Sequence, residues 1–415
     1  MGDKVFCIKT VKKRPIVDPE IPCTENFDLF EALESVYPLL DIILDYLDCD
    51  DLRSCCEVKN AWKEVAERIL CKRIQPSWFT CFKAVPRNKL NIYEHSDNLN
   101  FNNVGIGIIL YDFRRIKLNK YICIHNDDDV VSHGAKSKWN SVPEYFEKEL
   151  VPRNTDYCII SCPKVISHFH KNSKNLCKAS FFDGLFIPKI PKIRTAMFHC
   201  NPVRKNEIRS TVESNIHSHE EIRCLLMFST TDQKKALYNL LKELIPENDA
   251  SSVAVGGGII RGTKTFLQVN PAKSINSSND IFSIVFLKEK GAEADFNAFS
   301  YVIFGDDLSK EEFADEIFKF KGSTFLRTHS VVIRVCCSAK VDADEEPKIF
   351  NKIFPGIPIF GFHADGEIGW NCVLTPSTTE DVEECQAKKA KHKYPNVRHQ
   401  WSTVFVLITW GAILS

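Results

Sequence analysis

Residues 37–70 read YPLLDIILDYLDCDDLRSCCEVKNAWKEVAERIL, and this stretch decides the fold of the region from Asn26 to Leu70. Pro38 can occupy the first position of a helix, because proline lacks a backbone N–H that would be unpaired there in any case. The apolar side chains that follow cover almost the whole circumference of this helix; they are Leu39, Leu40, Ile42, Ile43, Leu44, Tyr46 and Leu47. A helix that is apolar on every side has to be buried on every side.

A second helix is predicted later in the same stretch, beginning at Asn60, which is a good N-cap residue. Its apolar side chains fall on one helical face and comprise Ala61, Trp62, Val65, Ala66, Ile69 and Leu70. A chain of about 45 residues is close to the lower limit at which a core can close alone. Part of this apolar surface should therefore contact another chain or domain, although an ordinary helical hairpin of a larger domain has the same pattern.

The segment 26–72 resembles an F-box, the helical module that ties a substrate receptor to the Skp-type adaptor of a cullin ubiquitin ligase. The family pattern is Leu-Pro, an apolar helix ending in Tyr-Leu, then Asp-Leu, then Val-Cys-Lys followed by Trp. Tyr37 and Pro38 stand in the place of Leu-Pro, and matching residues lie at 43–47 and 51–52 and at Val58 and Trp62. The resemblance implies that the adaptor is contacted, or its surface shaped, by Pro38, Ile43, Leu47, Leu52, Val58 and Trp62.

Three positions depart from the F-box pattern. Tyr37 replaces Leu, Leu40 stands where Glu is common, and Lys59 with Asn60 replaces Cys-Lys. These departures leave open a helical segment that docks a different partner and has no ubiquitin role.

The composition is that of an ordinary soluble globular protein, with 44% hydrophobic and 26% charged residues in a chain of 415. Lys plus Arg and Asp plus Glu both number 54, so no global field favours nucleic acid or acidic lipid, and neither partner is expected. The most apolar run is WSTVFVLITWGAILS near the C-terminus. It has about 15 residues where a membrane helix needs about 20, so a buried strand is predicted there.

The seventeen cysteines are scattered and include no CxxC motif, so neither a structural zinc site nor any other cofactor is expected. The first residues, MGDKVFCIKTVKKRP, lack the apolar region of a secretory signal peptide. We therefore expect reduced thiols and a location in the cytoplasm and nucleus.

The rest of the chain is predicted to follow an α+β or α/β plan. Residues 1–25 read as a flexible tail with a basic run and three prolines. Beyond 26–72, short β-rich runs alternate with amphipathic helices, which predicts a large domain with mixed sheets. The predicted strands are Gly105–Tyr111, Tyr121–His125, Tyr157–Cys162, Ile222–Phe228, Val253–Val255, Phe282–Leu287, Phe299–Phe304, Val331–Cys336 and Thr403–Thr409. The predicted helices are Asp232–Ile245 and Leu308–Phe320, the latter with a capping box at Ser309 and Glu312.

The polar stretch Arg204–His219 has no strong apolar periodicity. It is predicted to be a loop or linker between two halves of the large domain, which span residues 73–215 and 216–415.

Two motifs contain residues suited to binding but have the wrong spacing for it. The run SSVAVGGGIIRGTKT at 251–265 resembles a phosphate-binding loop, yet Thr263 displaces Lys264 by one residue, so close packing of a strand and a turn is preferred. A possible metal cluster, spaced unlike any familiar zinc finger, consists of Cys158, Cys162, His168 and His170.

The stretch FPGIPIFGFHADGEIGW at 354–370 contains four glycines and two prolines, so its backbone is predicted to turn repeatedly. Two interpretations remain open, a packed structural turn and a concave ligand or substrate site edged by a carboxylate. The residues of that possible site are Phe360, Phe362, Asp365, Gly366 and Glu367.

Phe-Gly-Phe followed shortly by Gly-Glu-Ile-Gly resembles the signature of the C-terminal FIST domain, an α/β sensory module found beside F-boxes. Together, the two resemblances imply a non-catalytic substrate receptor, joined through a Skp-type adaptor to a cullin-RING scaffold, that recruits unknown proteins for ubiquitination and proteasomal degradation. A FIST-type small-ligand sensor is the alternative. An enzyme that uses Cys336 or Cys337 with His363 has only residue types in its favour.

Overall fold

The computed structural model describes residues 6–8, 37–83, 89–114, 122–124, 150–152, 155–169, 180–201, 204–230, 232–260, 266–268, 273–274, 281–340, 343–374 and 394–414. The chain divides into two compact units. Unit 1 comprises Met1–Gly105, Lys117–Thr155 and Phe186–Pro188. Unit 2 comprises Ile106–Ile116, Asp156–Leu185 and Lys189–Ser415.

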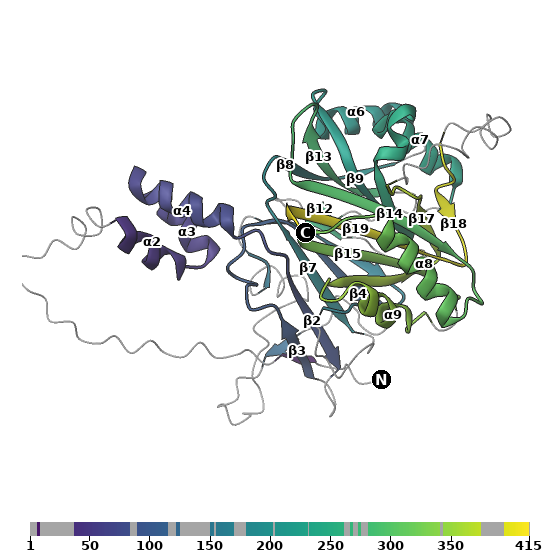
Figure 1. Ribbon diagram of the computed structural model, residues 1–415, viewed down its shortest axis with the longest axis horizontal. Coiled ribbons are helices and arrows are strands. Elements are labelled where there is room, and N and C mark those ends of the chain that lie inside the picture. Colours follow the sequence, from purple (N-terminus) through teal and green to yellow (C-terminus); the bar gives the residue numbers. More distant parts are fainter. Residues whose placement is uncertain are drawn as a thin grey trace, which may run out of the picture. The chain divides into compact units, whose positions relative to one another are not determined.

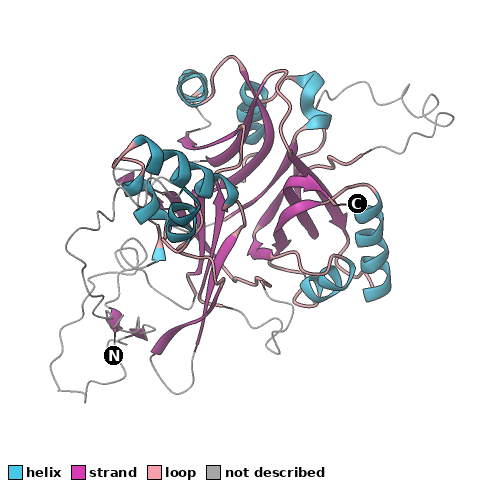
Figure 2. Cartoon of the chain, turned by 60° about the vertical axis from the view of Figure 1, so that its left-hand side comes forward, coloured by secondary structure: helices cyan, strands magenta, loops and turns pink. Residues whose placement is uncertain are grey.

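Unit 1 contains three short helices, α2 (Tyr37–Asp45), α3 (Cys49–Cys55) and α4 (Asn60–Lys72). The helices pack against one another (Figure 2). Their shared core consists of Leu40, Leu44, Cys49, Leu52, Cys55, Val65, Ala66, Ile69 and Leu70. The predicted pair of helices is therefore a cluster of three, because the DCDDL segment forms a helix of its own.

The residues just before α3 and α4 determine where these two helices begin. Helix α3 begins after Asp48, whose carboxylate accepts a hydrogen bond from the backbone N–H of Asp51 at 2.9 Å. Lys59 occupies the N-cap position of α4, and Asn60 is the first helical residue. The prediction that Asn60 caps this helix was wrong by one position.

Four strands also belong to unit 1, β1 (Phe6–Ile8), β2 (Ser77–Lys83), β3 (Lys89–His95) and β5 (Ile122–Ile124). β2 and β3 pair antiparallel, and β1 pairs parallel with both β3 and β5. Strand β1 lies within the predicted tail, and the other residues of that tail lie outside the described ranges.

Unit 2 is built from sheets that each mix parallel and antiparallel pairs. The first includes, in this order, the strands β12-β11-β6-β4-β7, with bounds Lys273–Ser274, Phe266–Gln268, Asp156–Cys162, Val104–Asp112 and Phe182–Pro188, of which Phe186–Pro188 belongs to unit 1. The second has the order β18-β17-β10-β9-β13-β8, with bounds Arg398–His399, Gly366–Gly369, Ala254–Ile259, Glu220–Ser229, Ile281–Glu289 and Ile193–Cys200. The third has the order β14-β19-β15-β16, with bounds Phe296–Phe304, Ser402–Ile413, Arg327–Cys337 and Ile359–Ala364.

Helices cover the outer faces of the second and third sheets (Figure 1). α6 (Lys205–Asn215) and α7 (Lys234–Leu244) lie beside β8 and β9, and α7 leads into a 3₁₀ turn at Glu247–Ser252. α8 (Lys310–Gly322) and α9 (Glu346–Ile353) pack on the third sheet. The core between these two helices and their sheet includes Phe313, Ile317, Phe320, Phe350, Val332, Phe405 and Leu407.

Glycines let the second and third sheets approach closely. Gly256, Gly257 and Gly258 lie inside the buried strand β10 and not in a turn. A Cβ added at Gly258 would lie 2.7 Å from the Cβ of Ala364, and one added at Gly369 would lie 2.7 Å from Val404 Cγ1. Gly257 has a φ of 143°, which side chains rarely allow. The three glycines therefore allow neighbouring strands to pack closely. The glycines that were predicted to form a turn after a strand lie within strand β10 itself.

The fold class is confirmed as a mixed α/β chain with a small helical region near its N-terminus. The predicted strands and both predicted helices of the large domain are present, and Ser309 and Glu312 form the predicted capping box. The stretch 204–219 was wrongly predicted to be a loop, because most of it forms helix α6. The predicted boundary between 215 and 216 falls at the end of that helix, inside unit 2.

Candidate functional site

Helix α2 has apolar residues on both sides, and only one side is buried. Leu40 and Leu44, spaced four residues apart, face the helical core and are fully buried. The opposite side exposes Ile42 and Tyr46, which are 59% and 80% accessible, together with Leu39 and Ile43 at 40% each. We call these four residues, Leu39, Ile42, Ile43 and Tyr46, the α2 face. An exposed apolar cluster of this kind is typical of a binding surface.

The residues predicted to contact the adaptor separate into three groups. Pro38, Ile43 and Val58 are exposed. Leu47 and Trp62 are half-buried and pack against the helical core. Leu52 is fully buried in that core, so it can shape a binding surface but not touch a partner. Leu39, Ile42 and Tyr46 were not among the predicted contacts, because the pattern did not show which side of the helix faces inward.

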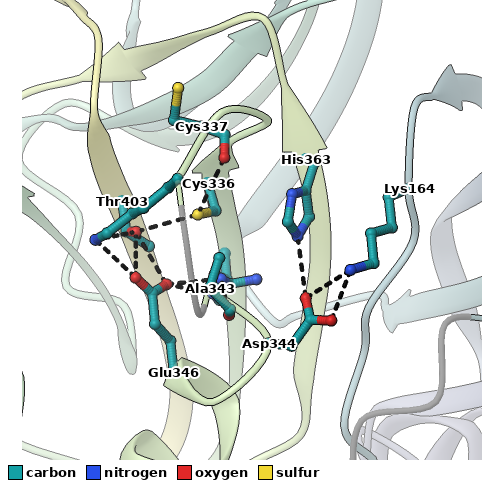
Figure 3. Close-up of polar contacts among 10 residues, drawn as sticks. Lys164, Cys336, Cys337, Ala343, Asp344, Glu346, His363 and Thr403 are labelled. Atoms are coloured by element: carbon teal, nitrogen blue, oxygen red, sulfur yellow. Dashed lines mark hydrogen bonds and ion pairs between the residues drawn. The ribbon is translucent and has the colours of Figure 1, made fainter. Parts of the chain in front are cut away.

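The interior of unit 2 contains an ionic network centred on one carboxylate. Nε and Nη2 of Arg334 donate to Oε2 of Glu346 at 3.0 and 2.6 Å. Lys340 Nζ lies 2.7 Å from Oε1 of the same carboxylate, and the hydroxyl of Thr403 donates to it at 2.9 Å (Figure 3). All four side chains are buried. Two buried cations therefore share one buried anion, an arrangement that is stable only when its hydrogen bonds are made.

Cys336 lies next to this network but is a poor nucleophile. Its sulfur lies 3.4 Å from the hydroxyl oxygen of Thr403. Burial, and after it the negative charge of Glu346, raises the pKa of Cys336 to about 12. Burial also raises the pKa of Cys337. Since the thiolate is the reactive form, both side chains are suited to packing and not to nucleophilic attack.

His363 on β16 lies beside a second ion pair. Lys164 Nζ donates to both carboxylate oxygens of Asp344, at 2.7 and 2.6 Å, and Nε2 of His363 is 3.8 Å from Oδ1 of Asp344 (Figure 3). Burial, followed by the positive charges of Arg334, Lys164 and Arg114, lowers the pKa of His363 to about 3. The imidazole is therefore neutral at pH 7.

The predicted ligand-site residues lie mostly inside the protein. Phe360 and Phe362 point into the core from β16, and Gly366 and Glu367 are buried in β17. Asp365 is half-buried at the turn between these strands. A protein substrate cannot reach the two rings in this structure, and a binding role for these residues stays a prediction.

Glu367 is a buried carboxyl with an unusual proton affinity. The backbone N–H and the hydroxyl of Ser402 donate to its Oε2 at 3.2 and 2.8 Å. Burial outweighs these bonds and raises the pKa of Glu367 to about 7. This group therefore changes charge near neutral pH inside the core.

The described members of the possible metal cluster, Cys158, Cys162 and His168, are not gathered into a metal site. Cys158 and Cys162 are buried in β6, and burial raises the pKa of both thiols above the ordinary range. His170 lies outside the described residues, as does the segment 261–265 that follows the triple glycine. Within the described ranges, no group of three or more His, Cys, Asp or Glu side chains is arranged to hold a metal ion.

None of the helices that the structure describes has the length and apolar character needed to cross a membrane.

Two hollows among the described residues of unit 2 each have the volume of a small-molecule site. One of about 700 Å³ lies between α6, β9 and α7 and has a mixed lining that includes the stacked rings of His217 and His219. The other, of about 390 Å³, lies beside the His363 ion pair. We call it the charged pocket; its lining is Arg114, Pro163, Lys164, Ser338, Lys340, Ala343, Asp344, Glu345 and His363.

The fold and these sites define a class of protein, a mixed α/β chain that also has a helical segment with an exposed apolar face. Sequence comparison adds a particular relative. The chain is distantly related to F-box only protein 22, being 22% identical to the Homo sapiens protein over 239 residues and 21% identical to the Pongo abelii protein over the same length. Each alignment covers 55% of this chain and 56% of the relative, so the chain spans about half the length of the curated relatives it matches.

Other comparisons add little. No family model matches the chain. Among solved structures, a cyanuric acid hydrolase from A. caulinodans aligns over 75% of this chain and 90% of its own, with 7% sequence identity and a TM-score of 0.29. A similarity this weak carries no argument about fold or chemistry.

Proposed function

We propose that this protein is a substrate receptor of a Skp-cullin-F-box ubiquitin ligase. In this proposal α2, α3 and α4 bind a Skp-type adaptor, and unit 2 recruits target proteins for ubiquitination and proteasomal degradation. The observation that carries the proposal is the α2 face, four apolar side chains exposed on a helix whose other side is already packed. The distant relationship to F-box only protein 22 supports the choice of partner.

The energetics favour an apolar partner for this face. Burying an aliphatic side chain contributes roughly 1.5–3 kcal/mol. Ile42 and Ile43 alone could therefore supply several kcal/mol to a complex, and Tyr46 adds a large ring that still has a polar end. Val58, exposed just before α4, would extend the contact beyond α2.

The proposed role needs no nucleophile in this chain. A receptor raises the effective concentration of a target lysine near a ubiquitin-charged enzyme that is bound elsewhere on the cullin-RING scaffold. The raised pKa values of Cys336 and Cys337 agree with a non-catalytic role, since both thiols stay protonated at neutral pH. The proposal includes action in the cytoplasm and nucleus.

Co-purification of a Skp-type adaptor with the tagged full-length protein tests this proposal. Ile43→Asp places a charge in the α2 face without touching the helical core, so we expect the adaptor to be lost while the protein stays folded. Phe318→Asp is the matched control, because Phe318 is 58% accessible and lies on α8 in unit 2. If the adaptor does not co-purify with the unaltered protein, or if both variants retain it equally, the proposal is wrong. A ligand-sensing protein that docks another partner would then be favoured.

A further inference from the structure

The charged pocket lies where four strands of unit 2 end. β4 runs parallel to β6, and β15 runs parallel to β16. Arg114 and Lys164 follow the carboxyl ends of the first pair, Ser338 follows β15, and His363 is the penultimate residue of β16. In α/β proteins, ligands bind preferentially outside the carboxyl ends of parallel strands. The volume of about 390 Å³ is in the range of about 300–1,000 Å³ that holds small molecules.

Backbone hydrogen bonds fix the two strand pairs to each other at this point. The N–H of His363 donates to the carbonyl of Lys164 at 3.0 Å, and the N–H of Ile166 donates to the carbonyl of Gly361 at 2.9 Å. The backbone positions that carry the Lys164 and His363 side chains are therefore held in a fixed relation before a ligand binds. A site built on such rigid elements loses little entropy when it binds.

The pocket has more positive than negative charge. Three cations in its lining, Arg114, Lys164 and Lys340, face two carboxylates. Asp344 is engaged by Lys164 at 2.6 Å, and Glu345 is paired with Lys348 at 2.6 Å. Behind the lining, the single carboxylate of Glu346 is shared between Lys340 and the fully buried Arg334. Positive charges therefore outnumber carboxylates across the described residues of the pocket and its network: Arg334 and Lys340 share one carboxylate inside the protein, and Arg114 is a further cation that is exposed to solvent.

Two buried nitrogen atoms in this neighbourhood lack hydrogen-bond partners among the described residues. One is Nε2 of His363, which is in the lining, and the other is Nη1 of Arg334, whose Nη2 donates to the carbonyl of the lining residue Ala343. His363 is 5% accessible, and its imidazole is neutral for the reasons given above. A neutral imidazole can present an N–H to an acceptor oxygen without adding charge. Buried polar atoms without partners usually mark a place for a ligand or an ordered water.

We propose that the charged pocket binds a small organic monoanion through its carboxylate. The carboxylate oxygens would accept from Arg114, Lys164 and Nε2 of His363, and the negative charge would offset part of the excess positive charge. A phosphate dianion fits less well, because Asp344 and Glu345 lie in the same lining and would repel the second charge. The proposal is independent of adaptor binding by unit 1.

Saturation-transfer NMR titration of the full-length protein tests the proposal, with lactate as the carboxylate probe. Lactamide, which has the same shape without the charge, and inorganic phosphate are titrated in parallel. We expect lactate to bind and lactamide not to bind. Arg114→Gln and Lys164→Gln should each weaken lactate binding by about tenfold, since each removes one charge-assisted hydrogen bond.

The control variant is Arg209→Gln, which removes an exposed arginine from α6, outside the pocket. It should bind lactate as the unaltered protein does, and circular dichroism of all variants confirms folding. The proposal is overturned if lactate does not bind, if lactamide binds equally well, or if phosphate binds in its place. It is also overturned if the Arg114 and Lys164 variants bind lactate as tightly as Arg209→Gln.

Discussion

The α2 face and the ionic network around Glu346 are opposite exceptions to the usual distribution of residues. The first exposes apolar side chains that water disfavours, and the second buries charges that the interior disfavours. An exposed apolar face costs the folded protein little and is useful only when a partner covers it. A buried network costs stability as soon as one member is missing. The comparison predicts that substitutions in the network alter folding, whereas substitutions in the α2 face alter binding.

The largest effect is expected from Glu346→Gln. This change leaves Arg334 and Lys340 buried without a counter-charge, so the free energy of unfolding should fall by about 3–5 kcal/mol. Urea unfolding followed by tryptophan fluorescence measures the change. Glu345→Gln is the matched control; its ion pairs are partly exposed, and it should cost no more than about 1 kcal/mol. Equal effects of the two variants would contradict the importance assigned to the network.

The two sides of helix α2 should respond differently to truncation. Leu44→Ala removes a fully buried side chain from the helical core and should cost about 2–5 kcal/mol. Ile42→Ala on the exposed side should change stability by no more than about 0.5 kcal/mol. Hydrogen exchange of the α4 amides reports the stability of the helical cluster. Strong destabilisation by Ile42→Ala would show that the α2 face is covered within the chain.

The buried carboxyl of Glu367 should make stability depend on pH. Its pKa is raised from 4.5 to about 7, so the native state binds a proton that the unfolded state releases, and stability falls as pH rises from 4.5 to about 7. The loss should be on the order of 3 kcal/mol. His363 acts in the opposite sense, because its pKa is lowered to about 3 and stability therefore falls as pH drops below 6.5.

The difference in stability between the unaltered protein and Glu367→Gln separates the contribution of Glu367 from the opposing contribution of His363. Thermal unfolding at pH 5 and at pH 7.5 measures it. The variant should lose less stability than the unaltered protein between these two values. Parallel pH profiles would mean that Glu367 has an ordinary pKa.

The smallest effect is expected where the second and third sheets pack. Gly369→Ala places a Cβ 2.7 Å from Val404 Cγ1 and 2.9 Å from the carbonyl oxygen of Val255, so overpacking should cost about 1–3 kcal/mol. Gly322→Ala at the end of α8 is the control, because a Cβ there meets nothing within 4 Å. Chemical denaturation of both variants checks the expectation. A neutral Gly369→Ala would mean that the two sheets can move apart at this point.

Strands with a simple apolar pattern were predictable from the sequence, and elements stabilised by other means were not. β9, β13 and β19 are nearly continuous apolar runs and were found. Helix α6 buries only Ile208 fully among its described side chains and is supported on its surface by pairs such as Arg209 with Glu213 at 2.9 Å, so no apolar periodicity revealed it. The glycines and prolines of 354–370 predict repeated turns, but Ile359–Ala364 forms strand β16, where Gly361 leaves room for the backbone of Ile166.

The α2 face and the ionic network also differ in how far each could be predicted from the sequence. The excess of apolar residues in 37–70 was visible in the sequence, but the choice of Leu40 and Leu44 as the inward pair depends on how α4 packs. The ionic network brings together residues from 334 to 403, and no spacing encodes that contact. One signal of the network is present in the sequence: Arg334 interrupts the apolar run VVIRVCC, and a charge within a buried strand requires a buried partner.

Calorimetric titration of a purified Skp-type adaptor into the full-length protein tests the central claim most directly. The unaltered protein and Phe318→Asp should bind with the same Kd, and Ile43→Asp should bind at least about tenfold more weakly with an unchanged unfolding midpoint. Equal affinity of all three proteins, or no binding by the unaltered protein, would contradict the claim that the α2 face is the adaptor-binding surface.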